Sequence, residues 1–263
     1  MSPPFRIPTG LAATDKLVVG CGLAVVCGLA WTAMAWQAGA MMPADTSGEA
    51  AMAGLPAALV DFVLIYLMWV VMMVAMMVPG ASPMIAVFAA INRRRREEGS
   101  PWVRTAVFLL GYLVAWSVFS AAAAAVQMML DDSGLLTPMM ASSSTALSAT
   151  LFAAAGLYQW TPLKDVCLKR CRSPIGFVLS EWRDGPVGAV VMGFRHGLYC
   201  VGCCAAIMGL LFAVAVMDLR WVATITVLVT MEKLLPWPRF WRHLIGTIFM
   251  SAACVLALGW ATV

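Results

Sequence analysis

Long apolar stretches alternate with short polar segments along most of the chain. A helix needs about 20 mostly apolar residues to cross the hydrocarbon of a bilayer, and several of these stretches reach that length. The pattern predicts about seven spans: Leu17–Trp36, Leu59–Ile91, Val103–Leu130, Met139–Trp160, Pro186–Met217, Trp221–Leu235 and Leu244–Val263. Because a helix satisfies its own backbone hydrogen bonds in lipid, we expect an all-α, polytopic transmembrane helical bundle. Residues 1–263 should form a single membrane domain.

Two of the predicted spans, residues 59–91 and 186–217, are longer than one straight crossing requires. The first contains Pro79 and Pro83, and a proline inside a helix removes a backbone donor and bends the helix. Interrupted helices of this kind build the binding sites at the midplane of many transporters. We therefore expect both spans to be kinked or broken, and to form the functional site together.

Basic residues gather in a few short segments next to the predicted spans. Arg93, Arg94, Arg95 and Arg96 end the second span, and a second basic segment covers Leu163–Gly185. Short basic loops stay in the cytoplasm, so we expect these segments and the N-terminus to lie there.

The composition supports a membrane protein. With 62% hydrophobic and 11% charged residues, the chain is far more apolar than a soluble domain. Its net charge of +4 comes from the loops and gives no reason to expect nucleic acid as a partner. The lipid bilayer is the expected surrounding.

One stretch of the fifth span contains four side chains that can bind a metal. His196, Cys200, Cys203 and Cys204 stand at i, i+4, i+7 and i+8, so they share one face of a helix. Imidazole and thiolate are ligands that soft metals such as Cu(I), and also Zn(II), select. The alternative is that the cysteines are small buried residues that only allow helices to approach closely. An ionisable histidine at membrane depth favours the metal site.

The second span carries a stripe of methionines: Met68, Met72, Met73, Met76 and Met77. Thioethers are soft and neutral, so they suit Cu(I) and can enter hydrocarbon without the cost of burying a charge. Methionine is also a flexible gap-filler in packed interiors, and packing is the alternative reading. At about 1.5 Å per residue, this stripe and the cysteines both fall near the middle of the membrane.

Sulfur ligands also change type from one side of the predicted bundle to the other. Methionine pairs recur at the outer edge: Met41-Met42, Met128-Met129 and Met139-Met140. At the inner side, Cys167 and Cys171 lie among basic residues that would lower their thiol pKa. Such a gradient suits Cu(I), because methionine survives where thiols are oxidised. The alternative for Cys167 and Cys171 is an interfacial helix whose cysteines face lipid.

Three charged residues near the cysteines or the inner side have open roles. Glu232 precedes Lys233 near the inner end of the sixth span, where we favour an interfacial role over that of a ligand or proton acceptor. Arg195 lies beside His196, where it would neutralise thiolates or extend toward the membrane surface.

Three motifs point to a known family: Met68-Trp69-Val70-Val71-Met72-Met73-Val74-Ala75-Met76-Met77-Val78-Pro79; Tyr158-Gln159-Trp160-Thr161-Pro162-Leu163-Lys164 with Cys167 and Cys171; and Met192-Gly193-Phe194-Arg195-His196-Gly197 with Cys200, Cys203 and Cys204. In these motifs the chain resembles bacterial predicted metal-binding integral membrane proteins, some of which are regarded as copper chaperones or copper-supply factors for copper enzymes. The resemblance implies copper handling in the bacterial inner membrane and no enzymatic activity. It also implies a copper enzyme or a metallochaperone as a partner.

The leading hypothesis is therefore a membrane copper-handling protein in which the methionine stripe faces His196, Cys200, Cys203 and Cys204 across a central cavity. Cys167 and Cys171 would exchange the ion at the cytoplasmic surface. Two alternatives compete. One is a membrane thiol-disulfide oxidoreductase using Cys200 with Cys203 or Cys167 with Cys171, and the other is a structural assembly subunit.

Overall fold

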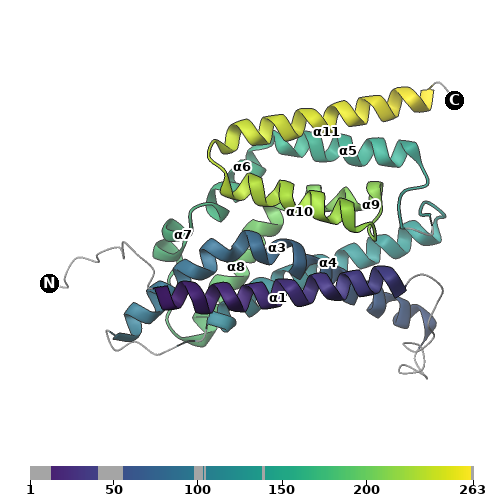
Figure 1. The fold of residues 1–263 in the computed structure, drawn as a ribbon. Coiled ribbons are helices and arrows are strands. Elements are labelled where there is room, and N and C mark those ends of the chain that lie inside the picture. Colours follow the sequence, from purple (N-terminus) through teal and green to yellow (C-terminus); the bar gives the residue numbers. More distant parts are fainter. Residues whose placement is uncertain (1–12, 41–55, 98–102, 104, 138–139, 262–263) are drawn as a thin grey trace.

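The computed structural model describes residues 13–40, 56–97, 103, 105–137 and 140–261, and over these ranges the chain is helical without a β-strand. The helices are α1 (Ala13–Ala40), α3 (Ala57–Glu97), α4 (Thr105–Asp132), α5 (Thr145–Gln159), α6 (Pro162–Cys171), α7 (Pro174–Glu181), α8 (Gly185–Gly209), α9 (Leu211–Val214), α10 (Leu219–Leu234) and α11 (Pro238–Ala261). The long ones run side by side (Figure 1). The predicted all-α bundle is confirmed for this part of the chain.

Five helices are long and apolar enough to cross a membrane: Gly20–Gly39, Ala57–Arg95, Thr105–Asp132, Gly185–Val214 and Pro238–Gly259. The predicted count of seven is not confirmed. The expected fourth and sixth spans coincide with α5 and α10, which have only 15 and 16 residues. Both are shorter than the roughly 20 residues that a complete crossing needs.

The chain passes back and forth between two ends of the bundle, where the connections gather, and the short α5 and α10 return it between α4, α8 and α11 (Figure 1). The C-terminus of α3, with its arginines, lies at the same end as α6 and α7, as the basic segments predicted. We call this the basic end, and we call the opposite end, where α4 stops and α10 begins, the far end. The predicted cytoplasmic N-terminus falls in residues 1–12, outside the described ranges.

The two over-long spans behave differently. Of the predicted kink or break in the second span, the break is not found, because α3 continues as one helix through Pro79 and Pro83. Pro83 has no N–H to offer the carbonyl of Pro79, four residues earlier. The Ser82 hydroxyl donates to that carbonyl instead, at 2.8 Å, so the helix continues. The fifth span is interrupted, as predicted, where α8 ends and α9 begins around Leu210.

Glycines bring α4 and α8 into close contact. A Cβ atom on Gly193 would stand 2.0 Å from the carbonyl oxygen of Phe108, and one on Gly111 would stand 2.1 Å from that of Val190. Real Cβ atoms do not approach backbone so closely, so the two helices can meet here only through glycine. This contact sets the cysteine face of α8 directly against Tyr112 of α4.

Candidate metal centre

Four thiols gather where α6 meets α8. Cys200, Cys203 and Cys204 are each 1% exposed, and the Sγ atom of Cys203 lies 3.3 Å from that of Cys204 and 3.8 Å from that of Cys171. The Cys203 thiol also donates to the backbone carbonyl of Cys200 at 3.2 Å. We call these four side chains the thiol cluster. Two sulfurs bound to one ion at about 2.3 Å lie roughly 3.8 Å apart in a tetrahedral site, so the observed spacing is close to that of metal ligands.

Lys233 of α10 points into this cluster. Its Nζ atom is 3.0 Å from Cys200 Sγ and 3.9 Å from the Sδ atom of Met77 on α3. Gly80 makes room for it, since a Cβ there would stand 3.2 Å from the Lys233 Cδ. The lysine is 7% exposed, and a buried ammonium is tolerated only beside groups that compensate its charge. The Cys200 sulfur is in direct contact with this ammonium.

Tyr112 holds the same cysteine from the side of α4. Its hydroxyl donates to the backbone carbonyl of Met77 at 3.1 Å and is in hydrogen-bond contact with Cys200 Sγ, also at 3.1 Å. The tyrosine and Lys233 therefore link α3, α4, α8 and α10 around one sulfur atom. Sequence reasoning did not assign either residue to the site.

His196 lies one helical turn before Cys200 and is 2% exposed. Its ring packs against Tyr112 and Phe177, with centroids 5.6 and 5.5 Å away. Its Nδ1 atom is buried and finds no hydrogen-bond partner within the described part of the chain. A buried ring nitrogen without a partner is costly, so this atom is available to a metal ion or a proton.

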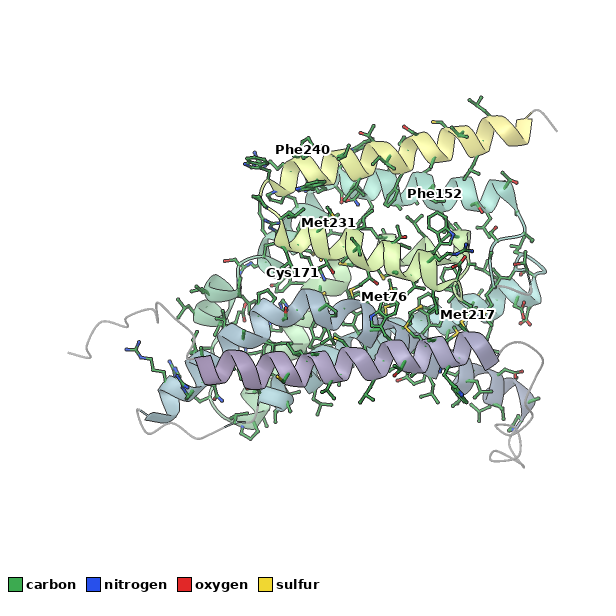
Figure 2. The ribbon with its side chains drawn as sticks, in the orientation of Figure 1. Met76, Phe152, Cys171, Met217, Met231 and Phe240 are labelled. Carbon is green, nitrogen blue, oxygen red and sulfur yellow. The ribbon has the colours of Figure 1, made fainter. Side chains whose placement is uncertain are left out.

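The methionine stripe of α3 is buried, with exposed fractions from 0 to 8%. Its members contact two different regions of the protein. Met77 reaches Lys233 beside the thiol cluster, whereas Met68 and Met72 line a separate small pocket toward the far end. The stripe therefore does not meet the cysteines as one set. Figure 2 labels Met76, which lies between the two regions.

Cys167 and Cys171 lie on α6, which begins at Pro162 after the Thr161 side chain accepts a hydrogen bond from the Lys164 backbone. Cys167 does not face lipid, because it is 8% exposed and its sulfur packs against Gly202 of α8. The predicted lowering of both thiol pKa values is wrong. Burial raises the pKa of Cys167, and hydrogen bonding with Cys200 is the first cause that raises the pKa of Cys171.

Glu232 lies in the interior of the protein. It is 1% exposed and forms a buried ion pair with Lys164 of α6, with a distance of 2.8 Å between Nζ and Oε2. The guanidinium of Arg172 donates to the carbonyls of Glu232 and Leu235. These bonds fix the end of α10 against α6. Removing one partner of a buried ion pair costs about 3–5 kcal/mol, so Lys233 extends from a rigid helix end.

Other charged groups at the basic end also hold the helices together. Asp165 of α6 pairs with Arg242 of α11 at 2.9 Å, and its hydrogen bond with Lys169 lowers its pKa. Arg195 forms an ion pair with Glu181 of α7, so it does not neutralise the thiols as one prediction had it. The cation that the described residues place against Cys200 is Lys233.

Among the described residues, no group of three or more histidine, cysteine or acidic side chains has the geometry of a ready-made metal site. The thiols bond to one another and to Lys233, so an ion that binds here would replace those hydrogen bonds. The donors nevertheless fit a soft ion, because the four thiols of the cluster lie near the Met77 thioether and the unpartnered imidazole of His196.

The comparisons with known proteins give one match. No curated protein and no solved structure is similar to the chain. A family model described as PpoB2, copper chaperone, matches residues 66–256. That range contains the methionine stripe, the thiol cluster and Lys233, and it covers well over half of the chain. The protein therefore belongs to the PpoB2 copper chaperone family.

Proposed function

We propose that this protein is a membrane-embedded copper chaperone that holds Cu(I) in the thiol cluster and passes the ion to a partner protein. The observation that carries the proposal is the gathering of Cys171, Cys200, Cys203 and Cys204 in one cluster, with Lys233 in contact with Cys200. Membership of a copper chaperone family supports copper as the cargo.

The donor set favours Cu(I) over harder ions. Thiolates and thioethers select Cu(I), whereas carboxylates and carbonyls suit hard cations. All eight cysteines are free thiols, and free thiols are the form that binds copper. His196 and Met77 would complete the coordination from the two sides of the cluster. Zn(II), which also takes thiolate and imidazole ligands, is the competing ion.

Lys233 supports a monovalent ion in particular. Its ammonium is a fixed positive charge 3.0 Å from the central sulfur, and Coulomb repulsion between two cations grows in proportion to the charge of the ion. A divalent ion such as Zn(II) therefore suffers about twice the repulsion that Cu(I) suffers for the same set of thiolates. The lysine therefore favours binding of Cu(I) over binding of Zn(II), because it repels Cu(I) less.

The path of release would lead through α6. Cys171 contacts Cys203 on one side, is less buried than the cysteines of α8, and lies at the basic end of the bundle (Figure 2). An ion shared between Cys203 and Cys171 is one ligand exchange away from the surface of the protein. A copper enzyme or a soluble metallochaperone that offers its own thiolates would take the ion there.

Titration of the purified full-length protein with Cu(I) under reducing conditions, against a competing chelator, tests this function. The variant C200S/C203S/C204S should lose about a hundredfold or more in affinity, since even residues behind metal ligands contribute ten- to a hundredfold. The matched control is C21S/C27S/C254S, which changes three cysteines outside the cluster and should bind as the wild type does. Equal affinity of the two triple variants would overturn the proposal.

The thiol-disulfide oxidoreductase remains a second candidate because Cys203 and Cys171 are in contact at 3.8 Å. That function needs a reversible disulfide between the two. Mass spectrometry of the protein after oxidation and after reduction separates the candidates. A copper chaperone forms no disulfide between these thiols during its working cycle, whereas an oxidoreductase cycles quantitatively between the dithiol and the disulfide.

A further inference from the structure

A second sulfur-lined pocket lies toward the far end, apart from the thiol cluster. It is lined by Met34, Gln37, Ala38, Met68, Met72, Val216, Met217 and Leu219. Four of these residues are methionines from three separate parts of the chain: α1, α3 and the connection between α9 and α10. We call this the methionine pocket. Met34 and Met217 lie outside every motif that the sequence analysis singled out.

The pocket is chemically unlike an ordinary apolar gap. Its volume is about 10 Å³, close to the space that one water-sized occupant needs. Among the described residues that line it, none is charged and Gln37 is the polar side chain. Thioethers are therefore the main soft donors among the lining side chains, and they coordinate soft ions without carrying charge or protons.

Burial also distinguishes these methionines from an exposed methionine of the same bundle. Met34, Met68 and Met72 are 6%, 8% and 2% exposed, whereas Met129 at the end of α4 is 68% exposed. Met217 is half-buried. Three thioethers thus come from the packed interior, and the fourth lies where the pocket meets the surroundings.

Further methionines of α3 lie between the pocket and the thiol cluster. Met72 and Met76 are one helical turn apart on α3, and Met77 next to Met76 reaches the Lys233 that contacts Cys200. Figure 2 labels Met217, Met76 and Cys171, which lie in that order from the far end to the basic end. Met41, Met42 and Met139, predicted to belong to the same edge, lie outside the described residues.

The geometry points to the methionine pocket as a second binding site for one soft monovalent cation, Cu(I) or Ag(I), held by the thioethers of Met34, Met68, Met72 and Met217. This site loads the ion at the far end, and Met76 and Met77 pass it inward. The loading role rests on the proposed function, since it supplies the thiol cluster. Binding in the pocket does not require the cysteines.

Silver is the probe, because Ag(I) has the charge and softness of Cu(I) and is not readily oxidised. The full-length protein should bind two equivalents of Ag(I), one in each site. In C200S/C203S/C204S, one weaker equivalent should remain. Adding M34L/M217L to that background should lower the remaining affinity by about tenfold or more, whereas adding M129L should leave it unchanged. Leucine conserves the volume of methionine closely enough for the fold to tolerate both exchanges.

A second measurement uses the cysteine-intact protein, in case the triple serine variant does not fold. There, M34L/M217L should reduce the stoichiometry from two equivalents to one and leave the tighter site unchanged. If M34L/M217L and M129L bind Ag(I) alike in both backgrounds, the four methionines only fill space and the inference is overturned. If the cysteine-intact protein binds one equivalent that the serine substitutions abolish, the loading site fails while the proposed function stands. If the wild type binds neither Ag(I) nor Cu(I), the proposed function itself fails.

Discussion

The thiol cluster and the methionine pocket both offer sulfur, but in opposite electrostatic settings. Around Cys200, a lysine ammonium and a tyrosine hydroxyl contact the sulfur directly, and every thiol ligand must lose a proton to bind metal. Around the methionine pocket, the described lining residues carry no charge and the thioethers have no proton to lose. Metal binding in the thiol cluster should thus be strong and should depend on pH, whereas metal binding in the pocket should be weak and independent of pH.

Dependence on pH should separate the two sites most widely. Because binding at the thiol cluster releases thiol protons, raising the pH increases its affinity for metal. For each proton released, the gain in affinity is about tenfold per pH unit, which is about a hundredfold between about pH 6 and about pH 8, below the usual thiol pKa of about 8.5.

The measurement is Ag(I) titration across this range in M34L/M217L, which keeps the thiol cluster, and in C200S/C203S/C204S, which keeps the pocket. The second variant should show no trend with pH. If the Ag(I) affinity of both variants rises in parallel with pH, binding in the pocket also releases protons. The two sites then do not differ in their dependence on pH.

The contact between α4 and α8 should matter for the thiol cluster and not for the pocket. In Gly193→Ala the new Cβ would meet the Phe108 carbonyl, and overpacking of this kind costs about 2 kcal/mol. Thermal unfolding in detergent should show the loss of stability. Copper binding at the cluster should weaken too, since Tyr112 would move away from Cys200.

Gly209→Ala is the matched control. It lies on the same helix, and a Cβ there would meet nothing within 4 Å, so stability and binding should stay as in the wild type. Equal melting temperatures for the two variants would contradict the close approach of α4 and α8.

Removing the charge of Lys233 should have the smallest of these effects. In Lys233→Met the repulsion of divalent ions falls more than that of Cu(I), so the ratio of Zn(II) affinity to Cu(I) affinity should rise about tenfold. The cost of deprotonating the thiols changes for both metals alike and cancels in the ratio.

Two further variants sharpen this result. Lys169→Met removes a lysine that is 62% exposed on α6 and should leave the ratio unchanged. Lys233→Arg keeps the charge and should restore most of the selectivity for Cu(I). A ratio that does not move in Lys233→Met would show that the lysine plays no part in selecting the ion.

The arrangement of sulfur was predictable from spacing to a large extent. The i, i+4, i+7, i+8 pattern placed His196 and the three cysteines of α8 on one face, and all four are buried. The same rule could not say which neighbouring helix each face meets. Met77 turned out to lie beside the cluster, whereas Met68 and Met72 line another pocket, because helix contacts far apart in sequence decide this.

The burial and the partners of charged residues could not be predicted from the sequence. Glu232 and Lys233 lie near the end of an apolar stretch, which is typical of interfacial residues. Their charges can be buried because Lys164 pairs with Glu232 and Cys200 contacts Lys233. Both partners come from distant segments of the chain. The predicted break in α3 failed for a local reason, since the Ser82 hydroxyl replaces the bond that Pro83 cannot make. A serine directly before a proline was the signal available in the sequence.

X-ray absorption spectroscopy at the copper edge, on the full-length protein loaded with one equivalent of Cu(I), tests the central claim most directly. We predict a first shell dominated by sulfur at about 2.3 Å, which C200S/C203S/C204S changes and C21S/C27S/C254S does not. A first shell of nitrogen and oxygen alone, or one that is the same in both triple variants, would contradict the account.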